Sequence, residues 1–138
     1  MLIIKSRSRD INDTSYIFIA SAPRASNGRG EIRFYTKRFV STNNFGYDTL
    51  QPIFHLNSNN RSVPFVLTGE QIGSYFGHTM TAGDLNGDGF TDLVISAPFY
   101  YSKKPSTGGM VYIYYGLNGK VEDLIEEFED CKFVLVFR

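Results

Sequence analysis

The sequence predicts an all-β protein built from antiparallel sheets. Aromatic residues make up 15% of the 138 residues, glycine occurs 13 times, and the apolar runs are short and end at proline or glycine. Aromatic and β-branched residues are enriched in strands, whereas glycine and proline form the turns between them. Fourteen basic and fourteen acidic residues give a formal net charge of zero, so nothing indicates nucleic acid as a partner.

The expected strands follow one another along the chain. Residues 16–22 are an apolar run that ends at Pro23, and residues 31–36 alternate polar and apolar side chains, so the two predict a hairpin. Residues 37–62 are rich in Asn, Ser and Thr, and they predict a long polar surface loop with room for one strand. Further strands are expected over residues 63–67, 76–83, 91–97, 110–115 and 133–137.

An internal repeat underlies this order. The sequence Ile-Ala-Ser-Ala-Pro at 19–23 recurs as Val-Ile-Ser-Ala-Pro at 94–98, 75 residues further on. A polar turn, a glycine and an aromatic-rich strand follow each copy. Two copies of one β-unit predict blades of a propeller or a related array.

The most specific motif is a short loop with the ligands of a hard cation. Residues 84–92 read Asp-Leu-Asn-Gly-Asp-Gly-Phe-Thr-Asp, which places oxygen-bearing side chains at loop positions 1, 3, 5 and 9. Calcium takes six to eight oxygens, at roughly 2.3–2.6 Å, from carboxylates, amides and carbonyls. The predicted calcium ligands are the side chains of Asp84, Asn86, Asp88 and Asp92 and the main-chain carbonyl of Phe90.

This loop is not an EF-hand. An EF-hand needs a bidentate Glu at position 12, where this chain has Ile95. Residues 91–97 are rich in β-formers, so a strand follows the loop in place of a helix. The alternative is an Asp/Asn/Gly turn that binds no metal, but three carboxylates within nine residues repel one another unless a cation lies between them.

The first copy of the repeat lacks most of these ligands. When the copies are aligned on Ser-Ala-Pro, Asp13 falls at the position of Asp88, and Ile17 takes the place of Asp92. No strong calcium site is expected there.

The second copy resembles a known repeat. Phe76-Gly77, the 84–92 loop and Ser96-Ala97-Pro98 together resemble the FG-GAP repeat, and residues 67–75 resemble its version in integrin α subunits. The likeness continues through residues 108–114, and Ser96 stands where the family name has glycine. The resemblance is strong over residues 63–118 and weak over 16–36.

The resemblance implies a seven-bladed β-propeller with calcium loops between the first and second strands of a blade. It implies a cell-adhesion receptor at the extracellular face of the plasma membrane, which pairs with an integrin β subunit and binds matrix or cell-surface proteins. The five ligands named above are the positions that match the family's calcium loop. Residues 24–29 and 99–108 are then candidates for ligand-facing upper loops, and the alternative is that they are plain solvated turns.

On this basis, the chain divides into four segments. They are a poorly matching N-terminal segment (1–15), a partial, degenerate blade with a long polar loop (16–62), a blade with the calcium loop (63–118), and the start of a next blade or a non-native tail (119–138). Two repeats do not close a seven-bladed ring, so a fragment of a propeller is expected. The sequence shows neither a signal-peptide core nor an apolar run of about 18 residues that would span a membrane. Asn12 and Asn60 begin glycosylation sequons, which matter in a secreted chain.

Two other functions are compatible with the sequence. The first is an accessory propeller of a secreted hydrolase, such as a phospholipase specific for glycosylphosphatidylinositol anchors, and the second is a stand-alone secreted lectin-like or calcium-binding β-domain. Catalysis by these residues themselves is not expected, because His55 and His78 are the only histidines and neither lies beside a nucleophile motif. His78 is expected to be a packed or edge histidine within a strand.

Overall fold

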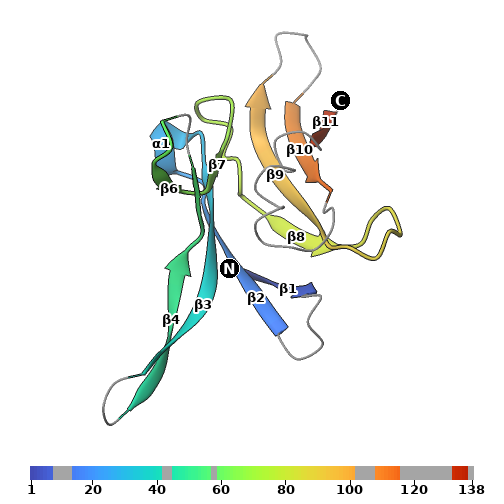
Figure 1. Cartoon of the computed structure of the whole chain (residues 1–138). Coiled ribbons are helices and arrows are strands. Elements are labelled where there is room, and N and C mark those ends of the chain that lie inside the picture. Colours follow the sequence, from blue (N-terminus) through green and yellow to red (C-terminus); the bar gives the residue numbers. More distant parts are fainter. Residues whose placement is uncertain (8–13, 42–44, 57–58, 102–107, 116–131, 137–138) are drawn as a thin grey trace.

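The structure, a computed structural model, describes residues 1–7, 14–41, 45–56, 59–101, 108–115 and 132–136. In this part of the chain almost all secondary structure is antiparallel strand, which confirms the predicted all-β class (Figure 1). The single helical element, α1 (Ala25–Gly28), is one turn. No helix in these ranges is long and apolar enough to cross a membrane.

The strands form two larger sheets and one small one. The first sheet contains β1 (Leu2–Arg7), β2 (Thr14–Ala22), β3 (Glu31–Ser41), β4 (Gly46–Pro52) and β7 (Val66–Thr68). The second contains β8 (Met80–Gly83), β9 (Asp92–Tyr101), β10 (Gly108–Tyr114) and β11 (Lys132–Val136). The small sheet pairs β5 (Phe54–Leu56) with β6 (Ser62–Pro64).

The sequence repeat is also a repeat of strand order and register. Strands β1 to β4 are neighbours in chain order, and strands β8 to β11 repeat this arrangement. Ala22 pairs with Glu31 across β2 and β3, and the equivalent Ala97 pairs with Met110 across β9 and β10. The two Ser-Ala-Pro copies therefore occupy the same place in two four-stranded antiparallel meanders, which is the arrangement of propeller blades.

Two predictions of secondary structure are wrong. Most of the polar stretch 37–62 is strand, because β3 continues to Ser41 and β4 pairs with it along 46–52. An extended hairpin satisfies its backbone by pairing, so it tolerates polar side chains on a solvated face. The strand predicted over 76–83 begins only at Met80, because Gly77 has a φ of +85° and turns the chain before it.

The segments near the two termini supply edge strands. β1 pairs along its whole length with β2, and β11 pairs with β10. The β-prone sequence near the C-terminus is therefore strand, as predicted, over residues 132–136. Both sheets need these segments to reach four strands in chain order.

The core lies between the two sheets, which bury opposite faces. The first sheet buries Ile17, Ile19, Ile32 and Phe34, and the second buries Leu93, Ile95, Ala97, Met110, Tyr112 and Tyr114. In the repeat alignment Ile19 corresponds to Val94 and Ile32 to Val111, and both valines lie on the other, half-buried face of their sheet. The sheets therefore stack front to back, as successive propeller blades do.

Phe76 and Gly77 connect the two sheets. The ring of Phe76 is buried and meets the ring of Tyr112 edge-on, with centroids 5.0 Å apart. The Phe76 N–H donates to the carbonyl of Arg29 at 3.1 Å, and the Gly77 N–H donates to the carbonyl of Ser96 at 2.9 Å. The Phe-Gly pair thus binds the turn after β2 on one side and β9 on the other.

Gly30 makes this connection possible. A Cβ added to Gly30 would lie 1.9 Å from the carbonyl oxygen of Phe76, far inside van der Waals contact. Its φ of +89° also favours glycine. Residue 30 must therefore be glycine for both conformational and packing reasons.

Ser96 occupies the position of the glycine in the Gly-Ala-Pro part of the FG-GAP pattern. It connects β9 to Thr79, the residue before β8. Its Oγ accepts a hydrogen bond from the N–H of Thr79 at 3.0 Å and donates to the carbonyl of Thr79 at 3.3 Å. The substitution is tolerated because the hydroxyl supplements the backbone bond from Ser96 N–H to the same carbonyl, at 2.9 Å.

We expect Gly30→Ala to destabilise the chain far more than Gly73→Ala. Both glycines have positive φ, but a Cβ at Gly73 meets nothing within 4 Å. Gly73→Ala should therefore cost about 1–2 kcal/mol from backbone strain alone, whereas Gly30→Ala should cost about 2–3 kcal/mol more from the clash with Phe76. Urea unfolding followed by circular dichroism measures both, and equal losses would contradict the proposed close contact.

Candidate metal centre

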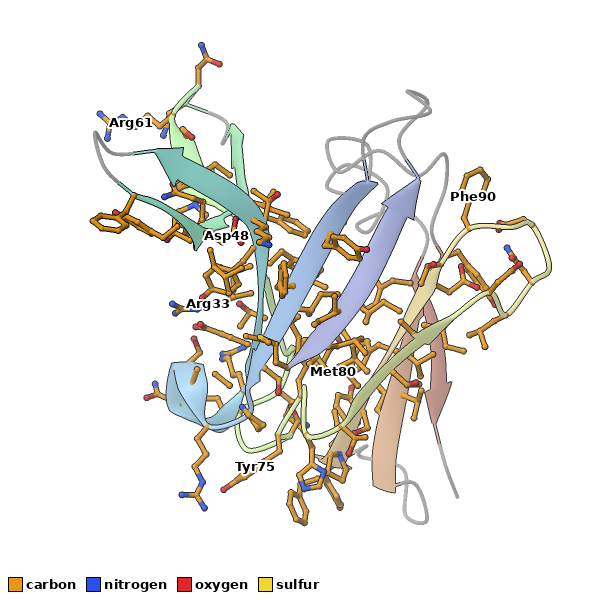
Figure 2. The ribbon with its side chains drawn as sticks, turned by 90° about the horizontal axis from the view of Figure 1, so that it is seen from below. Arg33, Asp48, Arg61, Tyr75, Met80 and Phe90 are labelled. Atoms are coloured by element: carbon orange, nitrogen blue, oxygen red, sulfur yellow. The ribbon has the colours of Figure 1, made fainter. Side chains whose placement is uncertain are left out.

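The candidate metal loop, residues 84–92, connects two paired strands of the second sheet. Gly83 at the end of β8 pairs with Asp92 at the start of β9, so the loop begins and ends at one rung of the ladder. Figure 2 shows Phe90 on this loop at one end of the molecule. The hairpin therefore brings the first and last predicted ligands close to the same place.

Asp84 organises the first half of the loop. Its Oδ1 accepts hydrogen bonds from the N–H groups of Gly87 at 2.7 Å and Asp88 at 3.1 Å, and its Oδ2 accepts from Gly89 at 2.9 Å. Gly87 and Gly89 have φ values of +77° and +87°. These conformations turn successive N–H groups inward, which explains why the loop needs glycine there.

Asn86 and Asp88 hold each other and the second half of the loop. The Asn86 amide donates to Oδ2 of Asp88 at 2.7 Å, and Asn86 Oδ1 accepts from the Asp88 N–H at 3.2 Å. Oδ1 of Asp88 accepts from the Phe90 N–H at 2.8 Å. Asp88 thus fixes the backbone of Phe90, whose carbonyl is the predicted main-chain ligand.

Asp92 closes the loop from within the protein. Its residue is 0% exposed, and its Oδ2 accepts a hydrogen bond from the Leu85 N–H at 2.7 Å. A buried carboxylate is costly unless it is hydrogen-bonded or paired with a cation. Because Ile17 is the equivalent buried residue of the first sheet, the two repeats use the same position for different purposes.

All five predicted ligands lie in one loop, and their side-chain oxygens face the loop's own donors. Within the described ranges, however, no three Asp, Glu, His or Cys side chains are grouped closely enough to form a preformed metal site. The donor set itself, three carboxylates and an amide oxygen, has the chemistry that calcium requires. Calcium binding by Asp84, Asn86, Asp88, Phe90 and Asp92 therefore stays a prediction, and Asp13 of the first copy lies outside the described residues.

A second feature, which the sequence did not reveal, lies away from this loop. A shallow surface cavity of about 430 Å³, open to solvent, is lined by Ala22, Pro23, Arg24, Ala25, Tyr75 and His78. His78 was expected within a strand, but it is exposed and precedes β8. The side chain of His55 lies outside the described part of the chain. Arg24 was part of a predicted upper loop, but only the fold brings residues 22–25 to residues 75–78.

The comparisons with known proteins agree with this architecture. Residues 76–114 match the FG-GAP repeat. Over 108 residues the chain is 32% identical to integrin alpha-7 of Rattus norvegicus, which covers 78% of this chain and 8% of that protein. It is 31% identical over 103 residues to integrin alpha-PS3 of Drosophila melanogaster, covering 75% of this chain and 8% of that protein. With integrin alpha-3 of Cricetulus griseus it is 47% identical over 49 residues, 36% of this chain and 5% of that protein.

The fold, the loop and these matches define a protein that contains an FG-GAP repeat. More particularly, the chain is a distant homologue of the propeller region of integrin α subunits. It spans about 8% of the length of integrin alpha-7. The resemblance inferred from Phe76-Gly77, the 84–92 loop and Ser96-Ala97-Pro98 is thereby confirmed.

We expect Asp84→Ala to loosen the loop even when a chelator removes every divalent cation. The N–H groups of Gly87 and Gly89 lose their acceptor and the Asp88 N–H keeps only its bond to Asn86, so the cost should be about 1–2 kcal/mol, as for loss of a helix cap. Asp84→Asn keeps one acceptor oxygen and should lose less. Amide hydrogen exchange at Gly87, Asp88 and Gly89 measures the effect locally.

The matched control is Asp48→Ala, which removes an exposed carboxylate that pairs with Lys37 at 2.6 Å on the first sheet. That change should leave exchange in the 84–92 loop unaltered. Equal protection of the loop amides in wild type and Asp84→Ala would show that Asp84 does not organise the loop.

Proposed function

We propose that this chain is the calcium-binding part of an integrin α-chain β-propeller, a module of a cell-adhesion receptor that binds extracellular ligands together with an integrin β subunit. The observation that carries the proposal is the match of residues 76–114 to the FG-GAP repeat. The 84–92 loop of this repeat brings three carboxylates and an amide together where β8 and β9 form a hairpin in the second sheet. The named relatives are integrin α chains, which favours this function over an accessory propeller of a secreted hydrolase.

The loop offers calcium both access and free lone pairs. Asp84 and Asp88 are exposed, and a carboxylate has about four lone-pair positions, of which Asp84 uses three and Asp88 two in hydrogen bonds. Asp84, Asn86, Asp88 and Asp92 would hold the ion with the Phe90 carbonyl. When bound, calcium supplies positive charge that offsets the repulsion among the three carboxylates.

The proposed role of the ion is structural. The loop joins β8 to β9, and Asp92 lies buried at its base, so charge compensation there stabilises the hairpin that carries the second sheet. In this proposal residues 63–118 contain the calcium blade and residues 16–62 most of the preceding one. Residues 1–15 and 119–138 contribute the edge strands β1 and β11.

The proposed setting is the extracellular face of the plasma membrane, as part of a receptor with matrix or cell-surface protein ligands. Extracellular calcium modules bind the ion at about 10⁻⁴–10⁻³ M, so the site would be filled outside cells. The chain acts in this proposal as a binding and structural module and not as an enzyme.

We expect one calcium ion per chain with a Kd of about 10⁻⁴–10⁻³ M, measured by isothermal titration calorimetry. Asp88→Ala should weaken binding at least tenfold, because it removes one of three charged ligands and the hydrogen bond that positions Phe90. Asp48→Ala, with the same loss of charge elsewhere, should bind calcium as the wild type does. Unchanged titration of Asp88→Ala would refute calcium binding by this loop.

A further inference from the structure

We propose that the cavity between the turn after β2 and residues 75–78 binds an acidic side chain of a protein ligand. The inference rests on the proposed function as a ligand-binding receptor module and names the ligand chemistry that one site on it would select. Four observations support it: the size of the cavity, the arginine that lines it, its fixed aromatic wall, and the exposed aromatic residue beside that wall.

The cavity is large enough for a side chain and its neighbouring backbone. Its volume of about 430 Å³ lies in the range of about 300–1,000 Å³ that is usual for ligand sites. Residues 22–25 form one wall and Tyr75 and His78 the other, so it lies where the turn of one sheet meets the approach to the next. A ligand bound there would contact the turn after β2 and the segment that leads into β8.

Among the described residues, the cavity is lined by one guanidinium, that of Arg24, and by no acid. His78 adds ring nitrogens that can hydrogen-bond, and the remaining lining residues are Ala22, Pro23, Ala25 and Tyr75. In the described part of the chain Arg24 forms no ion pair, whereas Lys37 and Arg33 each have a carboxylate partner. Arginine binds carboxylates through parallel N–H donors, which gives both strength and orientation.

The nearby acid at the start of β3 is already engaged. Glu31 accepts hydrogen bonds from the Ser26 hydroxyl and from the Arg33 guanidinium, the latter at 2.8 and 3.1 Å. The Ser26 bond and then Arg33 hold the pKa of Glu31 below its usual value. Glu31 is therefore not the partner of Arg24, whose exposed guanidinium stays open to a carboxylate of a ligand.

Tyr75 fixes one wall of the cavity before any ligand arrives. Its φ of +56° is costly for a residue with a bulky side chain. Its N–H donates to the carbonyl of Gly28 at 3.2 Å, its carbonyl accepts from the His78 N–H at 3.0 Å, and its ring meets Phe99 edge-on at 5.3 Å. Such strain concentrates at functional sites, and a wall held in place lowers the entropy cost of binding.

The surroundings favour a carboxylate on a peptide over an inorganic anion. Ala22, Pro23 and Ala25 give the cavity apolar surface that a side-chain stem can cover and a small ion cannot. The Tyr75 ring leads from the cavity to Phe99, which is 63% exposed. Exposed aromatic groups beside an arginine are typical of the centres of protein interfaces, so the expected motif is an acidic residue next to an apolar one.

This cavity and the calcium loop are separate. Figure 2 shows Tyr75 and Phe90 at opposite ends of the molecule. Binding at one can therefore be tested while the other is disabled.

The test is a titration of the ¹⁵N-labelled 138-residue chain with a blocked peptide, acetyl-Gly-Asp-Phe-Gly-amide, followed by NMR. We expect the amide signals of residues 24, 25, 75 and 78 to shift, and the same peptide with Asn in place of Asp to bind at least tenfold more weakly. Arg24→Gln should weaken binding of the Asp peptide about tenfold or more, and His78→Gln by a smaller factor. Both side chains are exposed, so these variants should keep the fold.

The matched control is Arg61→Gln, which removes an exposed arginine that Figure 2 places far from Tyr75. It should bind the Asp peptide as the wild type does. Equal binding of the Asn peptide, equal binding of inorganic phosphate, or equal losses in Arg24→Gln and Arg61→Gln would each overturn the proposal.

The same titration in a chelator separates this inference from the proposed function. Peptide binding that persists in the chelator, together with an unchanged calcium titration of Asp88→Ala, would leave the cavity proposal standing and refute the calcium role. Calcium binding with no peptide-induced shifts at residues 24, 25, 75 and 78 would do the reverse.

Discussion

The arrangement of this protein depends on one contact between two backbones, at Gly30 and Phe76. Because no side chain fits between them, the chain after β2 and the chain before β8 lie directly against each other. This proximity places the Phe76 ring in the core against Tyr112, and it sets where β8 begins. Both functional features follow from it: the hairpin with the 84–92 loop extends from β8, and Tyr75 and His78 come to face Arg24.

The sequence was most informative where a residue type has one physical use. The repeated Ser-Ala-Pro predicted two equivalent hairpins, and their register agrees residue for residue, as the pairs Ala22–Glu31 and Ala97–Met110 demonstrate. The alternating Asp and Gly of residues 84–92 likewise located the loop. The β3–β4 hairpin was missed because its stability comes from backbone pairing, which leaves little trace in a polar sequence. The cavity was missed because Arg24 and His78 meet only through the Gly30–Phe76 contact.

The two repeats differ at one buried position, which holds an apolar side chain in the first repeat and a carboxylate in the second. Ile17 and Asp92 are equivalent and both are buried. The isoleucine completes an apolar core and needs no partner, whereas the aspartate must find donors and does so at the Leu85 N–H. This buried position is therefore apolar in the first repeat and hydrogen-bonded to the loop backbone in the second.

Because the two sheets bury opposite faces, the two outer faces of the stack are different. One outer face is that of the first sheet, with Tyr35 and Phe18, and the other is that of the second, with Val94, Val111 and Ile113, all of them half-buried. Because these faces differ, a further sheet that repeats the contact between the first and second sheets joins head to tail, front face to back face. Growth by this heterologous rule ends in a closed ring when the rotation per sheet divides the circle, and in an open filament when it does not.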